Sequence, residues 1–314
     1  MPGLIFMKEI ILIAKIYSKL HLKNYDLYLE SLKQLEGGAT VINLLEDPGN
    51  PYLHFWYQQR GQGAVRALSD DIEAGLQGGL TWLWLGHPDY PQDFYGLEYP
   101  PFCLSYIGKP AWKRGSFISV VGSREPNPES IQWMQAQLPS LLHAYQLGVV
   151  SGGARGIDQA AHKVSVRSGQ PTVILVPSGL NKLYPDQLKD WVNIVCEMDG
   201  AIMSEYDYSA EMNKGYFQQR NRLIASLGVA TLILDARRRS GTMITARAAA
   251  DQGKSVYVMP SHARDCRGWG GLDLILEGAS FVRDSSDLIT FVGQDLNRIK
   301  SLTRPIVGCE LGHH

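Results

Sequence analysis

Short apolar runs alternate with segments of helix length from residue 116 onward. Continuous runs rich in β-branched residues, separated by helices, are typical of a parallel sheet that is buried on both faces. The sequence therefore predicts an α/β fold with a doubly wound, mostly parallel, Rossmann-like sheet. The expected strands are residues 117–121, 149–151, 172–176, 201–203, 229–234, 256–259 and 280–282. The expected helices between them are residues 129–145, 157–168, 186–192, 217–227, 243–252 and 284–291.

The first hundred residues have a different pattern. Helical periodicity around 25–35 and 64–76 predicts a smaller, mainly helical region in front of the sheet. An aromatic cluster at 52–57, followed by Trp82 and Trp84, is best explained as a small apolar core. A platform on which bases stack is the alternative interpretation of these aromatic residues.

Several prolines interrupt residues 89–101. Because proline fixes φ and disfavours a helix just before it, we interpret this stretch as a boundary. The expected organisation is a helical N-terminal region at 1–88, a Rossmann-like domain at 89–295 and a C-terminal tail at 296–314.

Composition narrows the possible partners. A net charge of −1 over 314 residues gives no global field that would attract nucleic acid, so such binding needs a local basic patch. The apolar segment 3–15 is interrupted by Lys8 and Glu9, and it is shorter than the roughly 18 to 20 residues of a membrane span. We interpret it as a buried first helix and expect no membrane association.

The cysteines are widely spaced and form no Cys-x-x-Cys pair. This spacing favours reduced thiols in a cytoplasmic protein, with neither a zinc site nor a disulfide framework. The four positions are Cys103, Cys196, Cys266 and Cys309.

Ligands of open α/β sheets bind outside the carboxyl ends of the strands. The residues that directly follow the predicted strands are rich in Gly, Ser and Arg, a composition that suits an anion. These segments are residues 122–124, 152–155, 178–185, 204–205, 235–241 and 260–262.

Residues 151–158, Ser-Gly-Gly-Ala-Arg-Gly-Ile-Asp, form a glycine turn between a strand and a helix. Such a turn places unpaired backbone N–H groups and the positive end of a helix dipole together, which attracts anions and phosphate in particular. Arg155 and His162 add donors of the matching sign, and Asp158 is expected to order the turn.

Gly122, Ser123 and Arg124 form a second turn of this kind. Glycine allows a close approach of the backbone, serine offers a hydroxyl, and arginine binds phosphate with two hydrogen bonds. The dinucleotide motif G-x-G-x-x-G is absent here, and no acidic residue follows at the spacing that ribose binding needs. A plain turn with an exposed arginine is the alternative interpretation.

Two helix starts carry arginine. Arg220, Asn221 and Arg222 are expected in the first helical turn, where a positive charge opposes the dipole unless an anion is bound. Residues 237–246 place three arginines before Ser240 and Gly241, and Thr242 and Thr245 add hydroxyls. Between residues 212 and 254 only two acidic residues oppose eight basic ones, which favours a polyanion as the ligand.

Catalytic patterns are less evident. No Ser-His-Asp order, metal-spaced His/Cys cluster or Walker sequence occurs. His162 is interpreted as a packed residue, and Glu205 has no identifiable partner as a general base. We therefore expect no enzyme activity, no cofactor and no metal.

Together these residues resemble the DNA-processing protein A (DprA/Smf) family over about residues 90–282. The resemblance is carried by Tyr90-Pro91 with Pro100-Pro101 and by segments 121–124, 151–158 with Ala161-His162, 178–185, 200–205, 217–222, 240–246 and 274–279. It implies an extended Rossmann domain that binds single-stranded DNA in a positive pocket, usually as a homodimer, and that passes the strand to RecA during transformation or recombination.

The resemblance transfers DNA contacts to Arg124, the Gly152-Gly153 turn, Lys182, Arg220 and Asn221. The complete set expected to bind single-stranded DNA or phosphate is Ser123, Arg124, Gly152, Gly153, Arg155, Gly179, Lys182, Arg220, Asn221, Arg222, Ser240, Gly241 and Thr245.

The chain departs from the family pattern at several positions. Gln218 stands where proline is usual, Gly153 replaces leucine, and Ser261 follows Pro260 where glycine is usual. Segment 268–272 reads Gly-Trp-Gly-Gly-Leu where the family has Ser-x-Gly-x-Asn, and too few residues follow Phe291 for the winged-helix module common in the family.

Two alternatives remain open at this point. One is a nucleotide-binding enzyme of phosphoribohydrolase-like type, although the expected Pro-Gly-Gly-x-Gly-Thr is replaced by Arg-Arg-Arg-Ser-Gly-Thr at 237–242. The other is a scaffold that has lost DNA binding and only recruits partners.

Overall fold

The computed structural model of the chain describes residues 2–20 and 25–303. Of the tail expected at 296–314, residues 304–314, which include Cys309, lie outside these described residues. Within them, a nine-stranded sheet has the order β1-β2-β6-β5-β4-β3-β7-β8-β9. Its strands are β1 Thr81–Trp84, β2 Cys103–Gly108, β3 Phe117–Gly122, β4 Gly148–Ser151, β5 Thr172–Leu175, β6 Ala201–Ser204, β7 Gly228–Leu234, β8 Ser255–Val258 and β9 Ser280–Phe281.

The predicted α/β class and the mostly parallel sheet are confirmed. From β6 to β9 across the sheet every pairing is parallel, whereas β1 pairs with β2 and β2 pairs with β6 in antiparallel fashion. Neither β1 nor β2 was among the expected strands. β1 lies before the boundary proposed at residue 88 and still belongs to this sheet.

Side chains of the central strands alternate between two apolar layers, as the two-residue repeat of a strand requires. Ile118 and Val120 of β3 pack in one layer with residues of α5 Pro128–Tyr145 and α6 Ile157–Arg167. Phe117 and Val121 pack in the other layer, together with residues of α8 Lys214–Leu227 and α9 Gly241–Asp251. Burial on both faces explains why these strands are continuously apolar.

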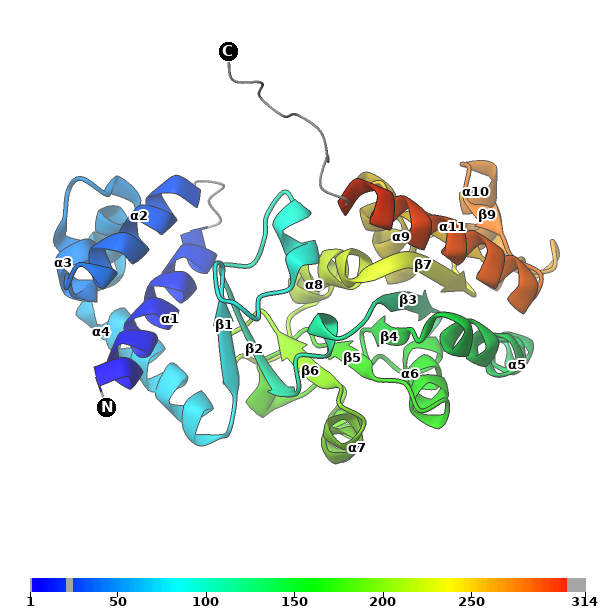
Figure 1. Cartoon of the computed structure of the whole chain (residues 1–314), viewed down its shortest axis with the longest axis horizontal. Helices are drawn as coiled ribbons and strands as arrows, with labels where there is room; N and C mark the ends of the chain where they lie inside the picture. Colours follow the sequence, from blue (N-terminus) through cyan, green and yellow to red (C-terminus); the bar gives the residue numbers. More distant parts are fainter. Residues whose placement is uncertain (1, 21–24, 304–314) are drawn as a thin grey trace, which may run out of the picture.

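The N-terminal helices α1 Pro2–Leu20, α2 Tyr25–Glu36, α3 Val41–Glu46 and α4 Pro51–Gln77 form the helical region. In Figure 1 they lie beside the β1 edge of the sheet. Residues from Ile10 to Tyr17 are buried, which confirms a buried first helix. Of the aromatic cluster, Trp56 is buried but Tyr52 and Phe55 are exposed, so only part of it belongs to the core. None of the described helices is both long and apolar enough to cross a membrane.

Several helix boundaries differ from the sequence expectation. The helix expected at 217–227 begins at Lys214, because Asn213 caps it with its side chain on the amide of Gly215. Arg220 and Asn221 therefore lie in the second turn and Arg222 at the start of the third, so the prediction that they oppose the dipole in the first turn is wrong. The helix expected at 186–192 is a 3₁₀ turn over Asp186–Asp190, which continues into α7 Trp191–Glu197. The helix α10 Trp269–Leu276 was not expected, and α11 Ser285–Thr303 runs well beyond Phe291.

The chain order of the strands fixes where a ligand site forms. From β3 the chain adds β4, β5 and β6 on one side and then returns to add β7, β8 and β9 on the other. The direction of winding changes between the neighbouring strands β3 and β7, whose last residues Gly122 and Leu234 are partners in register. In this class of sheet, the carboxyl ends at such a switch point form the ligand crevice.

His162 on α6 gives the fold a testable pH dependence. Its Nδ1 lies 2.6 Å from Thr172 Oγ1, and burial lowers the pKa of His162 to about 3. An unfolded histidine has a pKa of about 6.5, so the unfolded chain binds the proton more tightly. The contribution of His162 to the unfolding free energy should therefore fall as pH drops below about 6.5, and it should be about 1.4 kcal/mol lower at about pH 5.5 than at about pH 8.

Urea unfolding of wild type and His162→Asn at both pH values measures this contribution. The variant should lack the destabilisation that protonation of His162 causes at the lower pH, whereas His143→Asn, at an exposed position, should retain it. An identical pH dependence in wild type and His162→Asn would contradict the assignment.

Candidate functional site

A pocket of about 360 Å³ opens at the switch point between β3 and β7. Four segments contribute to it: the turn after β3, the start of α6, one face of α8, and the loop from β7 into α9. We call it the switch-point pocket. Its lining includes Gly122, Ser123, Arg124, Glu125, Asp158, Phe217, Arg220, Asn221, Asp235, Arg237, Ser240, Gly241, Thr242 and Thr245.

The structure brings together about half of the residues expected to bind an anion. Those in the lining are Ser123, Arg124, Arg220, Asn221, Ser240, Gly241 and Thr245. Those outside it are Gly152, Gly153, Arg155, Gly179, Lys182 and Arg222.

The glycine turn after β4 already has an internal acceptor. The carboxylate of Asp158 accepts hydrogen bonds from the backbone N–H groups of Gly152 at 3.2 Å and Ala154 at 3.3 Å. Asp158 therefore orders the turn, as the sequence suggested, but it also uses N–H groups that were expected to face an anion. Burial raises the pKa of Asp158 to about 6, and the charge of Arg220 opposes that rise.

The main contact of the turn is with Arg220. The guanidinium donates to the carbonyl oxygen of Gly152 at 2.9 Å and to that of Leu175, at the carboxyl end of β5. Only 4% of Arg220 is exposed. Burial lowers the pKa of Arg220 to about 10, while Asp158 acts in the opposite direction, so the side chain remains a cation at neutral pH.

One aromatic ring lies close to both this buried arginine and an exposed one. The guanidinium carbon of Arg124 lies 5.0 Å from the ring centre of Phe217, and that of Arg220 lies 6.0 Å from it. The ring of Tyr184 meets Phe217 edge-on at 5.9 Å. Sequence reasoning did not include Phe217 or Tyr184 in the site. The signal for Phe217 was its spacing of three and four residues from Arg220 and Asn221, which places all three on one helix face.

The start of α9 supplies the other polar part of the pocket. Ser240 does not cap the helix, because its hydroxyl donates to the carbonyl of Arg237 at 2.7 Å, and no acidic residue occupies the first turn. The first amide groups of α9 therefore retain their partial positive charge beside the pocket. Asn221 contacts the carbonyl of Gly241 at 3.3 Å and joins α8 to this helix start.

The expected residues outside the pocket have identifiable surroundings. Arg222 forms an ion pair with Glu205, and Lys182 lies 3.1 Å from Glu211. The loop that carries Lys182 is hydrogen-bonded to the segment after β6, since the backbone N–H of Gly179 donates to the carbonyl of Ala210 at 2.8 Å. Arg155 is exposed on the glycine turn.

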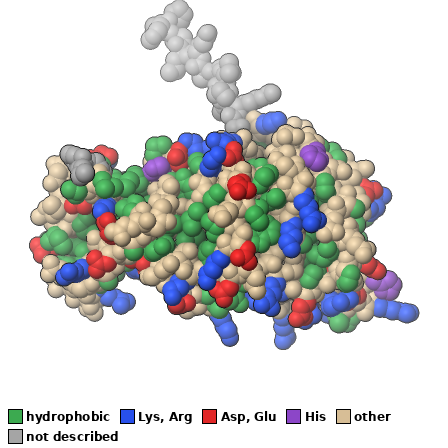
Figure 2. All heavy atoms as spheres, turned by 90° about the horizontal axis from the view of Figure 1, so that it is seen from below, with side chains coloured by type: hydrophobic (Ala, Val, Ile, Leu, Met, Phe, Trp, Pro, Cys, Tyr) green, Lys and Arg blue, Asp and Glu red, His purple; other side chains and the backbone are tan. Residues whose placement is uncertain are grey.

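The basic sector expected at residues 212–254 is largely balanced by acids from elsewhere in the chain. Arg238 pairs with Asp273 at 2.6 Å, and Lys254 lies 3.6 Å from Asp93. On the face seen in Figure 2, Lys and Arg side chains are scattered among acidic and hydrophobic ones instead of forming one block. The two acidic residues within this segment are therefore joined by acids from outside it, which reduce its net positive charge. Within the described ranges, no three His, Cys, Asp or Glu residues are grouped so as to hold a metal ion.

Comparison with known proteins identifies similar sequences. A family model described as DNA recombination-mediator protein A matches residues 81–293. Protein Smf of Synechocystis sp. is 30% identical over 226 residues, which cover 71% of this chain and 56% of that protein. The chain thus spans little more than half the length of this curated relative.

Two solved structures are also similar. DNA processing protein A of Streptococcus pneumoniae has a TM-score of 0.70 at 24% identity, covering 88% of this chain and 97% of that one, and this likeness concerns the fold. DNA processing protein A of Helicobacter pylori has a TM-score of 0.58 at 27% identity, covering 69% of this chain and 96% of that one. The latter structure was presented as giving insight into the single-stranded DNA binding mode of that protein.

The contact between Gly152 and Arg220 predicts a steric effect. A Cβ atom at Gly152 would lie 2.3 Å from Nη1 of Arg220, which both carbonyl contacts hold in place. Gly152→Ala should lower the unfolding free energy by about 1–3 kcal/mol, as overpacking usually does. Gly241→Ala is the matched control, because a Cβ there meets nothing within 4 Å and its stability should change little. Urea denaturation compares the two variants, and equal stabilities would contradict a tight contact.

Proposed function

This chain belongs to the DNA recombination-mediator protein A family, and on that premise we propose that it binds single-stranded DNA in the switch-point pocket as a recombination mediator. The match of the family model to residues 81–293 supports this assignment. So does the likeness to the Helicobacter pylori protein, whose structure concerns single-stranded DNA binding.

The observation that carries the proposal is the Phe217 ring with the guanidinium groups of both Arg124 and Arg220 close to it. A single strand offers both phosphates and unpaired base faces, and proteins bind it with cations and aromatic rings placed together. In a duplex the base faces are stacked within the helix. The same arrangement therefore favours a single strand and requires no particular base sequence.

We assign the contacts as follows. Arg124 and the amide end of α9, with Ser240, Gly241 and Thr245, bind phosphate, and Ser123 and Asn221 add hydrogen bonds. Arg220 supplies a fixed positive charge from its buried position in the pocket lining. Lys182 attracts the strand from its exposed loop, and Gly152, Gly153 and Arg155 shape the turn that supports Arg220.

The further parts of the proposal follow from the family. We propose that the protein acts in the cytoplasm as a homodimer, that it binds and does not chemically alter DNA, and that it passes the strand to RecA. No contact in the pocket specifically favours a phosphoribohydrolase-like enzyme, and the family assignment favours the mediator over a scaffold without DNA binding.

Substitution of the exposed cations tests the pocket. Arg124→Ala should weaken binding of a single-stranded oligonucleotide of roughly 20 nucleotides about tenfold, because a phosphate contact and part of the aromatic stack are lost. Adding Lys182→Ala should remove most binding at low salt. Fluorescence anisotropy at two salt concentrations measures both effects, and the wild type should prefer a single strand to a duplex.

Arg167→Ala is the matched control, since Arg167 is an exposed arginine at the far end of α6. Circular dichroism checks that each variant is folded. Unchanged affinity of the double variant would refute the site, and no binding of the wild type to any single strand at low salt would refute the function.

A further inference from the structure

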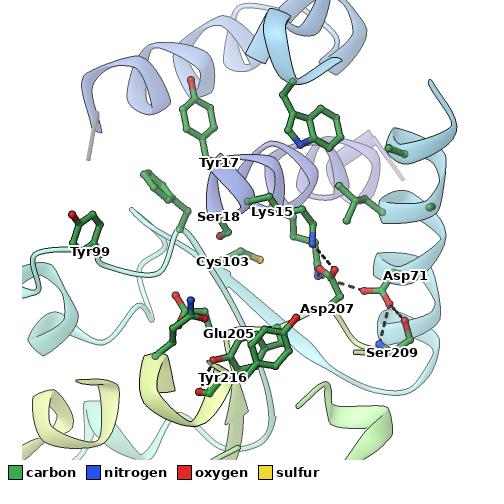
Figure 3. Close-up of a pocket in the computed structure, with 18 of the residues that line it drawn as sticks. Lys15, Tyr17, Ser18, Asp71, Tyr99, Cys103, Glu205, Asp207, Ser209 and Tyr216 are labelled. Carbon is green, nitrogen blue, oxygen red and sulfur yellow. Dashed lines mark hydrogen bonds and ion pairs between the residues drawn. The ribbon is translucent and has the colours of Figure 1, made fainter. Parts of the chain in front are cut away.

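A second, larger cavity lies between the helical region and the sheet. It measures about 1060 Å³ and is bordered by α1, α4, the segment after β6 and α8 (Figure 3). We call it the inter-region cleft. Neither the glycine turn nor any residue expected to contact DNA, apart from Arg222, contributes to its lining.

Helix α8 separates this cleft from the switch-point pocket. Tyr216, Gln219 and Arg222 line the cleft, whereas Phe217, Arg220 and Asn221 line the pocket. With 3.6 residues per turn, these two sets fall on opposite faces of one helix. The two cavities are therefore close neighbours that share a wall of one helix thickness.

The acids of the cleft are paired with cations. Lys15 lies 2.8 Å from Asp207 and 3.4 Å from Asp71, and Lys19 lies 2.6 Å from Asp207. Glu205 pairs with Arg222. These pairs leave the lining without excess negative charge, so the cleft does not repel an anionic chain.

Lys19 and Arg60 are exposed cations of this lining. Lys19 pairs with Asp207, whereas Arg60 on α4 has no acidic partner among the described residues. Aromatic side chains belong to the same lining. Trp56 and Tyr99 line the cleft, and Tyr216 stacks on Tyr206 with ring centres 3.8 Å apart. Figure 3 shows Tyr216 and Glu205 together near α8, with Tyr99 at one side of the view and Asp71 at the other. A cation next to aromatic rings is the combination that binds a single strand.

Two buried polar atoms add hydrogen-bonding capacity. Oε2 of Glu205 and Nη1 of Arg222 have no hydrogen-bond partner within the described part of the chain, although the two side chains are paired through their other atoms. An unsatisfied acceptor beside an unsatisfied donor matches a ligand that presents both, and the edge of a nucleobase does so.

We propose that the inter-region cleft holds the continuation of the single strand that occupies the switch-point pocket. The inference rests on the proposed function and extends it to a second subsite. The strand passes the start of α8, where Lys214 and Gly215 are exposed. Arg60 then binds a phosphate, and the rings of the cleft receive a base.

Oligothymidylates of two lengths test this inference. A strand of roughly 5 nucleotides fills one cavity, and one of roughly 20 spans both, because single-strand sites take about 4–16 nucleotides. Arg60→Glu should weaken binding of the long strand three- to tenfold and reduce its salt dependence by about one phosphate contact. Binding of the short strand should not change. Arg66→Glu, at an exposed arginine of α4 outside the cleft, is the matched control.

The outcomes separate the two proposals. Equal effects of Arg60→Glu on both lengths, or no effect on either, would overturn the second subsite while Arg124→Ala still reports on the first. Wild type that binds neither length would refute the proposed function itself. Thymidine monophosphate that binds the wild type but not Arg60→Glu, with long-strand affinity unchanged, would identify a free nucleotide as the occupant instead.

A cross-linking measurement gives independent evidence. A long strand that carries 5-iodouracil should form photoproducts with Tyr99 or Tyr216, detected by peptide mass spectrometry. Photoproducts confined to Phe217 and Tyr184 would overturn the proposal.

Discussion

The burial of Arg220 is the constraint on which the site depends. A buried cation is costly unless hydrogen bonds and opposite charge compensate for its lost hydration. Here the carbonyl oxygens of Gly152 and Leu175 receive its N–H groups, and Asp158 contributes the opposite charge. These contacts tie the carboxyl ends of β4 and β5 to α8. The guanidinium of Arg220 occupies the space that a side chain at Gly152 would need, so glycine is required at that position of the turn.

The parallel part of the fold could be predicted because its strands are buried on both faces and so are continuously apolar. The two antiparallel strands at the edge were missed because β1, Thr-Trp-Leu-Trp, reads as part of an aromatic cluster and β2 lies just after the proline-rich stretch. The start of α8 was missed for a local reason. Lys214 and Gly215 precede the first apolar position, and glycine is a poor helix former, yet Asn213 caps the helix there.

The site was predictable in its position but only partly in its chemistry. The sequence pattern placed Arg124 and the start of α9 at the carboxyl ends of the expected strands, and the observed strand order brings them together with Arg220 at one switch point. The partner of each charge was not derivable. Asp273 and Glu205 neutralise Arg238 and Arg222 across long sequence separations, which only the tertiary structure reveals. Asp158 was expected to order the turn, but not to do so by accepting from the N–H groups expected to hold phosphate.

The helical region is connected to the segment between β6 and α8, and through it to the Lys182 loop, by hydrogen bonds and ion pairs. Asp71 of α4 accepts from the amides of Tyr208 at 2.8 Å and Ser209 at 3.0 Å. The carbonyl oxygen of Tyr208 in turn accepts a hydrogen bond at 3.0 Å from the backbone amide of Asn181, which precedes Lys182. Lys15, which is almost fully buried, holds Asp207 in the same segment. These contacts are lost if the helical region moves relative to the segment between β6 and α8. The helical region therefore positions the Lys182 loop and also forms one wall of the inter-region cleft. A change in how these helices pack would therefore reach both proposed DNA subsites through the segment between β6 and α8.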